Sequence, residues 1–280
     1  MKKIAIQGEI GAYHEIAARK FFEGEEIEIL PCHTFEDVFT SIKNDNSIIG
    51  IVAIENTIAG SLLPNYELLR SSDCRIFGEY KLRISHTFSA LPGQKIEDIK
   101  EVHSHPVALM QCSNFLSQYP HIKVIESEDT ALSAKEIMEC KEKGKAAICS
   151  SLASEMYGLE ALFKGIETNK RNFTRFLLVA EPWATEELSK KYNKNKASLV
   201  FSLPHSNGSL SKVLTILSFY EMNLSKIQSL PIIGHEWEYL FYVDLTFENY
   251  LRFKQSIDAI IPLTRNLKIL GEYEDGKQSI

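Results

Sequence analysis

The sequence lacks the features that would place a protein in a membrane, on nucleic acid or outside the cell. Its 280 residues carry 31 Lys and Arg against 37 Asp and Glu, a net charge of −6, so no basic field is available to attract nucleic acid or an anionic membrane. No apolar run approaches the roughly 20 residues that a membrane helix needs. The apolar stretch after Met1-Lys2-Lys3 is too short for a signal-peptide core. These absences predict a cytoplasmic protein.

Cysteine is scarce and unpatterned. The chain has five cysteines, an odd number, with no Cys-x-x-Cys pair, which argues against a disulfide framework and a thiolate zinc site. His33, His103 and His105 are not spaced with carboxylates as metal ligands usually are. We therefore expect reduced thiols, no metal and no cofactor.

The pattern of apolar and polar residues changes near residue 180. Before it, short apolar runs alternate with helical patterns, which predicts an α/β architecture with a largely parallel sheet. A polar, lysine-rich stretch over 181–196 is typical of a linker. After it, the patterns follow the order strand, helix, two strands, helix, strand, which is the ferredoxin-like α+β order. We predict domains at 1–180 and 197–280.

The apolar periodicity also predicts the individual elements. In the first domain, strands are expected at 3–6, 27–30, 48–54, 101–103, 123–125, 146–149 and 175–179, and helices at 13–22, 35–43, 61–70, 106–118, 131–143 and 152–157. In the second, strands are expected at 198–203, 224–231, 239–247 and 267–273, with a turn at Gly234-His235, and helices at 210–220 and 250–261.

Five expected strands are each followed by a helix, and the junctions between them contain glycine, hydroxyl or acidic residues. These junctions are residues 8–12, residues 55–61, Ser104-His105-Pro106, Asp129-Thr130 and Ser150-Ser151. Helix N-termini present unpaired N–H groups, and in open α/β sheets such junctions meet at the carboxyl ends of the strands, where ligands bind. Together they favour a small anionic ligand, although helix capping explains each one taken singly.

The junction sequences resemble the motifs of the prephenate dehydratase family, in the family's order and spacing. The matching stretches are Gln7-Gly8-x-x-Gly11-Ala12-Tyr13-x-Glu15, Ile54-Glu55-Asn56-Thr57-x-x-Gly60-Ser61, Ser104-His105-Pro106-x-Ala108-Leu109-x-Gln111-Cys112, Asp129-Thr130-Ala131-x-Ser133-Ala134, Ala146-Ala147-Ile148 through Tyr157-Gly158-Leu159, and Asn172-Phe173-Thr174-Arg175-Phe176. The C-terminal part resembles the family's ACT domain through Asn207-Gly208-Ser209-Leu210, Asn223-Leu224-Ser225-Lys226-Ile227 and residues 239–244. The resemblance spans nearly the whole chain.

This resemblance implies two α/β lobes around a cleft, like type II periplasmic binding proteins, followed by a ferredoxin-like ACT regulatory domain. Lobe one would be about 1–78 with 170–180, and lobe two about 79–168. The chain would cross between them at Phe77-Gly78-Glu79 and Phe163-Lys164-Gly165. A hinge with two crossings permits closure around a ligand.

The activity that the resemblance implies is the cofactor-free conversion of prephenate to phenylpyruvate in phenylalanine synthesis, a hydro-lyase reaction. Aromatisation drives it, so the protein has to position the substrate and assist the departing hydroxide. Two alternatives stay open: arogenate dehydratase, and a non-catalytic small-molecule sensor. The intact Asn172-x-Thr174-Arg175-Phe176 argues against the sensor.

Thr174 of the family's Thr-Arg-Phe motif is the implied assistant of the leaving hydroxide. A threonine hydroxyl is a very weak acid, so we expect it to donate a hydrogen bond. Strand neighbours alternate sides, so Asn172 shares the side of Thr174, whereas Arg175 either clamps a carboxylate or pairs with Glu55. The remaining expected substrate contacts are Gly11, Ala12, Glu55, Asn56, Thr57, Ser61, Ser104, His105 and, as a wall, Phe176.

In ACT domains of this family, phenylalanine binds between two subunits, at the loop after the first strand of one and the second strand of its partner. The corresponding residues here are Asn207, Gly208, Ser209 and Leu210, and Gln228, Ser229, Leu230 and Pro231. The family's usual Glu-Ser-Arg-Pro is replaced by Gln-Ser-Leu-Pro, so both charged residues are missing. We expect a homodimer or homotetramer formed through ACT domains, with L-phenylalanine as a weaker inhibitor than in relatives with the charged motif.

Overall fold

The computed structural model describes residues 1–232, 234 and 238–279, so His235 of the expected turn lies outside the described part. The chain forms two compact units. Unit 1 contains Met1–Asn65, Tyr80–Phe176 and Gln278–Ile280, and unit 2 contains Tyr66–Glu79 and Leu177–Lys277. The grouping of residues 66–79 with the C-terminal part was not predicted, because their apolar pattern is that of an ordinary helix and strand.

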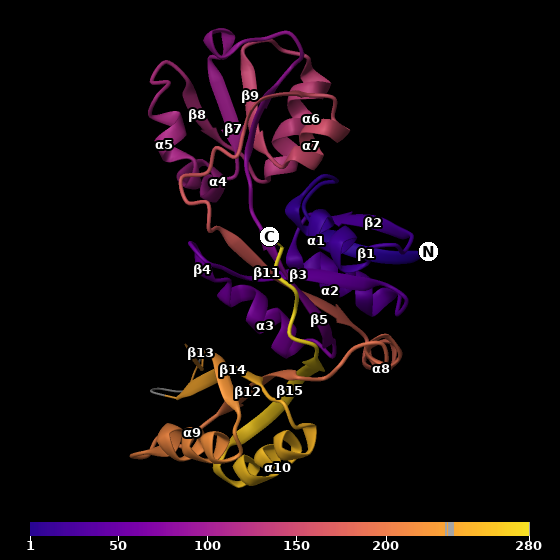
Figure 1. Ribbon diagram of the computed structural model, residues 1–280, viewed down its shortest axis with the longest axis vertical. Coiled ribbons are helices and arrows are strands. Elements are labelled where there is room, and N and C mark those ends of the chain that lie inside the picture. The colour runs from indigo at the N-terminus through magenta and orange to yellow at the C-terminus, as the bar shows by residue number, and fades with distance from the viewer. Residues whose placement is uncertain (233, 235–237, 280) are drawn as a thin grey trace. The chain divides into compact units, whose positions relative to one another are not determined.

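The first lobe of unit 1 is built on a sheet with the strand order β11-β3-β1-β2, in which β1 is parallel to both of its neighbours, β2 and β3 (Figure 1). Its complete elements are β1 (Lys2–Gln7), α1 (Tyr13–Phe21), β2 (Ile27–Cys32), α2 (Phe35–Asn44), β3 (Ile49–Asn56) and β4 (Gly60–Ser61). Three further elements are shared with unit 2, namely α3 (Leu63–Ser71), β5 (Arg75–Arg83) and β11 (Phe173–Ala180). β3 is buried over nearly its whole length, as expected of a central parallel strand covered on both faces. Asn56 is the last residue of β3 and therefore lies at the end of the sheet where the strand stops.

The second lobe of unit 1 is a mixed sheet with the strand order β10-β6-β9-β7-β8. Its elements are β6 (Thr87–Ala90), the short 3-10 helix Ile96–Asp98, β7 (Glu101–Ser104), α4 (Pro106–Gln111), α5 (Ser113–Leu116), β8 (Lys123–Glu126), α6 (Thr130–Cys140), β9 (Lys145–Cys149), α7 (Ser151–Met156) and β10 (Glu160–Lys164). Figure 1 shows α4 and α5 on one side of the sheet and α6 and α7 on the other. Phe88, Val102 and Ile148 belong to the fully buried core under α4 and α5.

The two lobes are joined by residues 84–86 and 165–172. β5 runs straight through Phe77-Gly78-Glu79, so the first crossing comes later in the chain than the sequence suggested. Glu167 ties the crossings together, because its Oε2 accepts a 2.9 Å hydrogen bond from the backbone N–H of His86, and its Oε1 lies 3.9 Å from Arg83. His86 is thereby held at the junction of the lobes.

Unit 2 has the predicted βαββαβ order. Its elements are α8 (Pro182–Ser189), β12 (Lys196–Ser202), α9 (Ser209–Phe219), β13 (Asn223–Pro231), β14 (Tyr239–Thr246), α10 (Tyr250–Ile260), the 3-10 helix Ile261–Leu263 and β15 (Arg265–Tyr273). The strand order is β13-β14-β12-β15, with β5 next to β15. Both α9 and α10 lie on one face of this sheet in Figure 1. A Cβ on Gly271 would lie 2.3 Å from Ile76 O, so glycine permits the approach of β5.

Several sequence-based expectations need correction. Residues 181–196, expected as a linker, contain α8, which starts with Pro182 in its first turn, where proline is tolerated. The expected helix over 106–118 is divided at Cys112. The strands β5, β6 and β10 were not predicted. β6 and β10 are short, and β5 mixes charged with apolar residues, so none of them shows a clear pattern.

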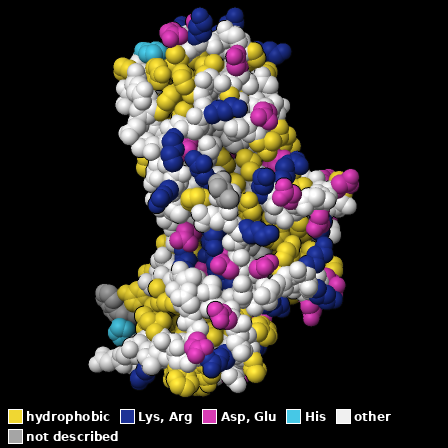
Figure 2. All heavy atoms as spheres, viewed as in Figure 1, with side chains coloured by type: hydrophobic (Ala, Val, Ile, Leu, Met, Phe, Trp, Pro, Cys, Tyr) yellow, Lys and Arg dark blue, Asp and Glu magenta, His cyan; other side chains and the backbone are white. Residues whose placement is uncertain are grey.

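No helix in the described ranges is both long and apolar enough to cross a bilayer. On the face in Figure 2, basic and acidic side chains are interspersed, without a field of one sign. This mixture of signs agrees with the small net charge of the sequence.

Candidate active site

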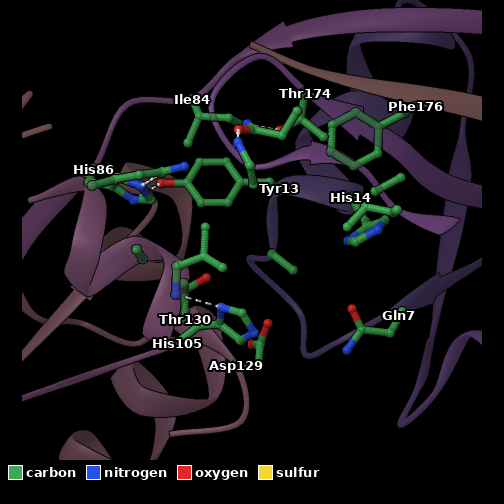
Figure 3. Close-up of a pocket in the computed structure, with 18 of the residues that line it drawn as sticks. Gln7, Tyr13, His14, Ile84, His86, His105, Asp129, Thr130, Thr174 and Phe176 are labelled. Carbon is green, nitrogen blue, oxygen red and sulfur yellow. Dashed lines mark hydrogen bonds between the residues drawn. The ribbon is translucent and has the colours of Figure 1, made fainter. Parts of the chain in front are cut away.

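A cavity of about 260 Å³ lies in unit 1 and receives side chains from both lobes (Figure 3). α1 supplies Tyr13 and His14, and β11 supplies Thr174 and Phe176. The other polar residues that line it are Gln7, Asn56, His86, His105, Gln111, Glu128, Asp129 and Thr130. The cavity therefore sits at the carboxyl ends of strands, where the junctions predicted a ligand.

The orientation of the Asn56 amide is fixed by the backbone. The N–H groups of Ile58 and Ala59 both donate to Asn56 Oδ1 at 2.9 Å. Asn56 Nδ2 must therefore face the other way, where it donates to Thr174 Oγ1 at 2.9 Å and Asn172 Oδ1 at 2.8 Å. Because Thr174 Oγ1 accepts this bond, its own hydrogen has no acceptor among the described residues and is available to a ligand.

The same logic extends from Asn172 to His86. With its Oδ1 toward Asn56, Asn172 donates from Nδ2 to Gln111 Oε1 at 2.8 Å. His86 Nε2 lies 2.8 Å from the same Gln111 oxygen. An amide oxygen only accepts, so His86 Nε2 must carry a hydrogen. The backbone N–H groups beside Asn56 thus determine, through three amides, the tautomer of a histidine across the cavity.

Tyr13 completes this chain of polar groups. Its hydroxyl lies 2.8 Å from His86 Nδ1 and 2.9 Å from Ser85 O. Burial raises the pKa of Tyr13 well above its ordinary value and lowers the pKa of His86. Both side chains are therefore neutral near pH 7. The result is an uncharged hydrogen-bonded network that orients groups without ionic attraction.

Helix caps form the second-lobe rim of the cavity. His105 Nδ1 accepts a 3.2 Å bond from Val107 N–H and caps α4. Asp129 Oδ1 accepts from Ala131 N–H and Leu132 N–H at 2.8 and 2.9 Å and caps α6. Burial raises the pKa of Asp129, opposed by these backbone hydrogen bonds. At these two junctions capping and cavity lining coincide.

The glycine junction after β1 brings the lobes into contact. Gly11 has φ +91°, and a Cβ there would lie 2.7 Å from Ala153 Cα in α7. Ser150 Oγ donates to Gly11 O at 2.6 Å, and Tyr157 hydroxyl donates to Ile10 O at 2.8 Å. A side chain at residue 11 would force the lobes apart, so glycine is needed here for close approach.

Comparison with known proteins identifies this arrangement. The sequence matches the family model of prephenate dehydratase over residues 4–183. An Arabidopsis thaliana protein named arogenate dehydratase/prephenate dehydratase 2, chloroplastic, is 34% identical over 283 residues, covering 97% of this chain and 72% of the relative. The chain belongs to the prephenate dehydratase family. Prephenate dehydratases are hydro-lyases, and the chain is an enzyme of that class.

Two solved structures share the fold over almost the entire chain. One, described as GqqA, a novel type of quorum quenching acylase, is 26% identical with a TM-score of 0.85, covering 98% of each chain. The other, described as prephenate dehydratase from Arthrobacter aurescens in complex with L-Phe, is 23% identical with a TM-score of 0.85, covering 99% of this chain and 92% of that one. The second likeness shows the fold alone.

The structure brings five of the predicted site residues to the cavity of this prephenate dehydratase relative. They are Ala12, Asn56, His105, Thr174 and Phe176. Asn172 is fully buried behind them and links Asn56 to Gln111. Asn172 is thus one step removed from the cavity lining, and its role in orienting substrate stays a prediction.

The other predicted contacts lie outside the cavity lining. Arg175 NH1 lies 4.0 Å from Glu55 Oε2, the ion-pair alternative. Thr57 Oγ1 accepts from Phe173 N–H at 2.9 Å, and Ser104 Oγ donates to Ile148 O at 2.6 Å. Gly11 makes the lobe contact described above, and Ser61 pairs with Glu55 between β3 and β4. Each has a structural partner that accounts for its position.

Sequence reasoning missed Gln111, His86 and His14 as residues of the cavity. Gln111 stands inside a motif that carried the family resemblance, which was a usable signal. His86 follows a strand that the periodicity did not indicate, and His14 is one of two polar residues in the first turn of α1. Neither has a local pattern that distinguishes it from an ordinary surface histidine.

Proposed function

We propose that this chain converts prephenate to phenylpyruvate, carbon dioxide and water in the unit 1 cavity, with Thr174 donating a hydrogen bond to the leaving hydroxide. The electron pair of the broken carbon–carboxylate bond enters the ring, and the carbon–oxygen pair leaves with hydroxide, which takes a proton to form water. The observation that carries the proposal is the Thr174 hydroxyl, which accepts from Asn56 and keeps its hydrogen for the cavity. A preoriented donor of this kind stabilises charge that develops at the leaving oxygen.

The charge of the cavity supports a reaction that ends in loss of carbon dioxide. Among the described residues, no lysine or arginine lines the cavity. A cation placed against the ring carboxylate would stabilise the substrate more than the transition state, in which that charge moves into the ring. The neutral network holds the substrate by hydrogen bonds and leaves the departing carboxylate without a fixed counterion.

A hydrolytic activity, suggested by the likeness to the structure described as an acylase, is less well supported. Acyl transfer needs a nucleophile with a base beside it. The Thr174 hydroxyl is contacted by the Asn56 amide nitrogen, which donates and does not accept a proton. Cys112 and Cys149 are buried, and burial raises the pKa of each thiol to about 12, which makes both poor nucleophiles.

The activity is tested by offering the purified chain prephenate, arogenate and an N-acyl amide in parallel. We expect phenylpyruvate from prephenate, and a smaller rate of phenylalanine formation from arogenate. Faster turnover of arogenate than of prephenate would make the chain an arogenate dehydratase. Hydrolysis of the amide without turnover of either ring substrate would overturn the proposal.

Unit 2 is, in this proposal, an ACT-like regulatory domain that binds L-phenylalanine between two copies of the chain. β13, which carries Gln228, Ser229, Leu230 and Pro231, is the edge of its sheet, so a second copy can approach there. Gly208, with φ +76°, is the residue before α9, so Asn207 and Gly208 lie in the loop while Ser209 and Leu210 form the beginning of the helix. The relative from Arthrobacter aurescens was solved with L-Phe. Assembly as a homodimer or homotetramer and a cytoplasmic location stay predictions.

α3 offers a structural connection through which effector binding in unit 2 can influence the cavity in unit 1. In unit 2, Tyr66 packs on Tyr242 with ring centroids 5.0 Å apart, and Lys226 Nζ of β13 lies 5.4 Å from the Tyr66 centroid. In unit 1, Asn65 Nδ2 donates to Ala53 O of β3 at 2.7 Å. Asn65 and Tyr66 are consecutive residues of one helix, so movement of β13 is passed along the chain to the strand that ends at Asn56. Inhibition requires that phenylalanine favour one position of α3 over another.

This coupling is tested with Lys226→Met, which removes the cation from Tyr66 and keeps the side-chain length. Calorimetry should give nearly unchanged phenylalanine binding, while inhibition of prephenate turnover weakens. The matched control is Lys212→Met on α9, which should change neither. Equal inhibition of the Lys226→Met and wild-type proteins by phenylalanine would show that α3 does not transmit the effect. The absence of a heat of binding at millimolar phenylalanine would show that the effector site is vestigial.

A further inference from the structure

His14 is placed where only a bound molecule can complete its hydrogen bonding. Its ring packs edge-on against Phe176, with centroids 4.9 Å apart and planes at 79°, and against Phe35 at 5.5 Å. It lines the cavity, and Figure 3 shows it beside Phe176 with Gln7 below it. Its Nε2 is buried and has no hydrogen-bond partner among the described residues. A buried polar atom without a partner costs about 1–3 kcal/mol, which a ligand hydrogen bond recovers.

The other two cavity histidines each have a hydrogen-bond partner within the protein. His86 uses both ring nitrogens, toward Tyr13 and Gln111. His105 Nδ1 is used to cap α4. His14 differs further because burial lowers its pKa to about 3, so the ring is neutral near pH 7. Its free nitrogen is a neutral hydrogen-bonding group with aromatic rings on two sides.

The distance along β11 indicates which part of the substrate meets His14. Thr174 and Phe176 lie on the same side of the strand, two residues and hence about 7 Å apart. His14 contacts Phe176, so it faces the cavity roughly one strand repeat from the Thr174 hydroxyl. In prephenate the leaving hydroxyl and the pyruvyl group are attached at opposite ends of the ring. A substrate with its hydroxyl at Thr174 can therefore extend its side chain toward His14.

We propose that His14 is a specificity-determining residue, which donates a hydrogen bond from Nε2 to the keto oxygen of the pyruvyl side chain. The proposal rests on the function proposed above. The keto oxygen is replaced by an ammonium in arogenate, so His14 meets the group by which the two substrates differ. A ketone loses little solvation in a pocket walled by Phe35 and Phe176, whereas an ammonium loses much and finds a neutral acceptor in return. His14 thereby favours prephenate.

The test is the ratio of kcat/KM for prephenate to kcat/KM for arogenate in three variants. His14→Phe keeps an aromatic ring but removes the nitrogen, and should lower kcat/KM for prephenate roughly tenfold, mainly through KM, the scale of one hydrogen bond. Arogenate should lose less than about threefold, because it gains little from a neutral acceptor. His14→Gln retains a donor and should restore part of the prephenate rate. His14→Glu adds a partner for the ammonium and should move the ratio furthest toward arogenate.

The matched control is His121→Phe, a change of the same type at an exposed residue outside the cavity lining. It should leave both values unchanged. If His14→Phe lowers kcat/KM equally for both substrates, or if His14→Gln gives no recovery, His14 is a packing residue and the inference is wrong. If the wild-type protein turns over neither substrate, the proposed function itself fails, and the two failures are thus distinguishable.

Discussion

Two buried hydroxyls in this chain, Thr174 on β11 and Ser198 on β12, sit in networks of opposite kind. Thr174 Oγ1 accepts from Asn56 and keeps its hydrogen for the cavity. Ser198 Oγ donates to Asp244 Oδ1 at 2.6 Å and lies 2.6 Å from the Tyr273 hydroxyl. Since the one Ser198 hydrogen goes to Asp244, Tyr273 must donate to Ser198.

The difference shows how to separate a functional from a structural polar cluster. The unit 2 network joins three buried side chains and satisfies the Ser198 hydroxyl in both directions, so that hydroxyl contributes to stability. In unit 1, by contrast, the Thr174 hydroxyl accepts a bond and keeps its own hydrogen, and His14 Nε2, beside the network, is buried without a hydrogen-bond partner among the described residues. Both unsatisfied groups face the same cavity. Unused hydrogen-bonding capacity, more than burial, marks the site.

The largest effect is expected for Thr174→Ala. It should lower kcat for prephenate by roughly 10²–10⁴-fold, the scale of losing acid–base or oxyanion-type assistance. The free energy of unfolding should fall by less than about 1 kcal/mol, because Asn56 Nδ2 keeps Asn172 Oδ1 as an acceptor. Thr174→Ser should retain much of the rate. Steady-state kinetics and urea unfolding measure both, and normal turnover by a folded Thr174→Ala protein would end the assignment.

Asn56→Asp should come next, with a loss of roughly 10–10³-fold in kcat. The N–H groups of Ile58 and Ala59 favour the ionised form of the new carboxylate. An ionised carboxylate accepts only, so the Thr174 hydrogen turns toward it and away from the substrate. The control is Asn114→Asp, in a helix of the second lobe and outside the cavity lining, which should be fully active. Near-normal turnover by Asn56→Asp would show that the direction of the Thr174 hydrogen is unimportant.

Ser198→Ala tests the structural role of the unit 2 network. Removing this hydroxyl leaves the buried Asp244 and Tyr273 oxygens with one partner fewer, which should cost about 1–3 kcal/mol of unfolding free energy. The rate for the folded protein should change by less than about twofold, since Ser198 touches no substrate. A Ser198→Ala protein with wild-type stability would contradict the closed network.

The smallest effect is expected from removal of metal ions. No three His, Cys, Asp or Glu side chains in residues 1–232, 234 and 238–279 are grouped as metal ligands. Dialysis against a strong chelator should leave prephenate turnover unchanged, because aromatisation drives the reaction without a Lewis acid. Loss of rate that added zinc or magnesium restores would contradict this.

The sequence could predict elements with strong local patterns and side chains on one strand. The buried run of β3, the capping box of Thr34 and Asp37 at the start of α2, and the βαββαβ order each follow from neighbours in the chain. Strand alternation also separated Thr174, which lines the cavity, from Arg175, which faces Glu55.

The rest of the site depends on contacts between distant segments. Asn56 meets Asn172 and Gln111 meets His86 only because two lobes and two crossings place them together, and no periodicity encodes such pairs. For the same reason Thr57 and Ser104 were expected to bind substrate, although the fold uses their hydroxyls on the backbone. The free hydrogen of Thr174 could not be foreseen without knowing which way the Asn56 amide faces.

The most direct test of that last point is the rate of the double variant Asn56→Asp/Thr174→Ala. If Asn56 acts by orienting the Thr174 hydroxyl, removing the hydroxyl makes the identity of residue 56 irrelevant, so the double variant should have the kcat of Thr174→Ala within about threefold. Losses that multiply, so that the double variant is slower than Thr174→Ala by the full factor of Asn56→Asp, would show that Asn56 acts independently and would contradict the account.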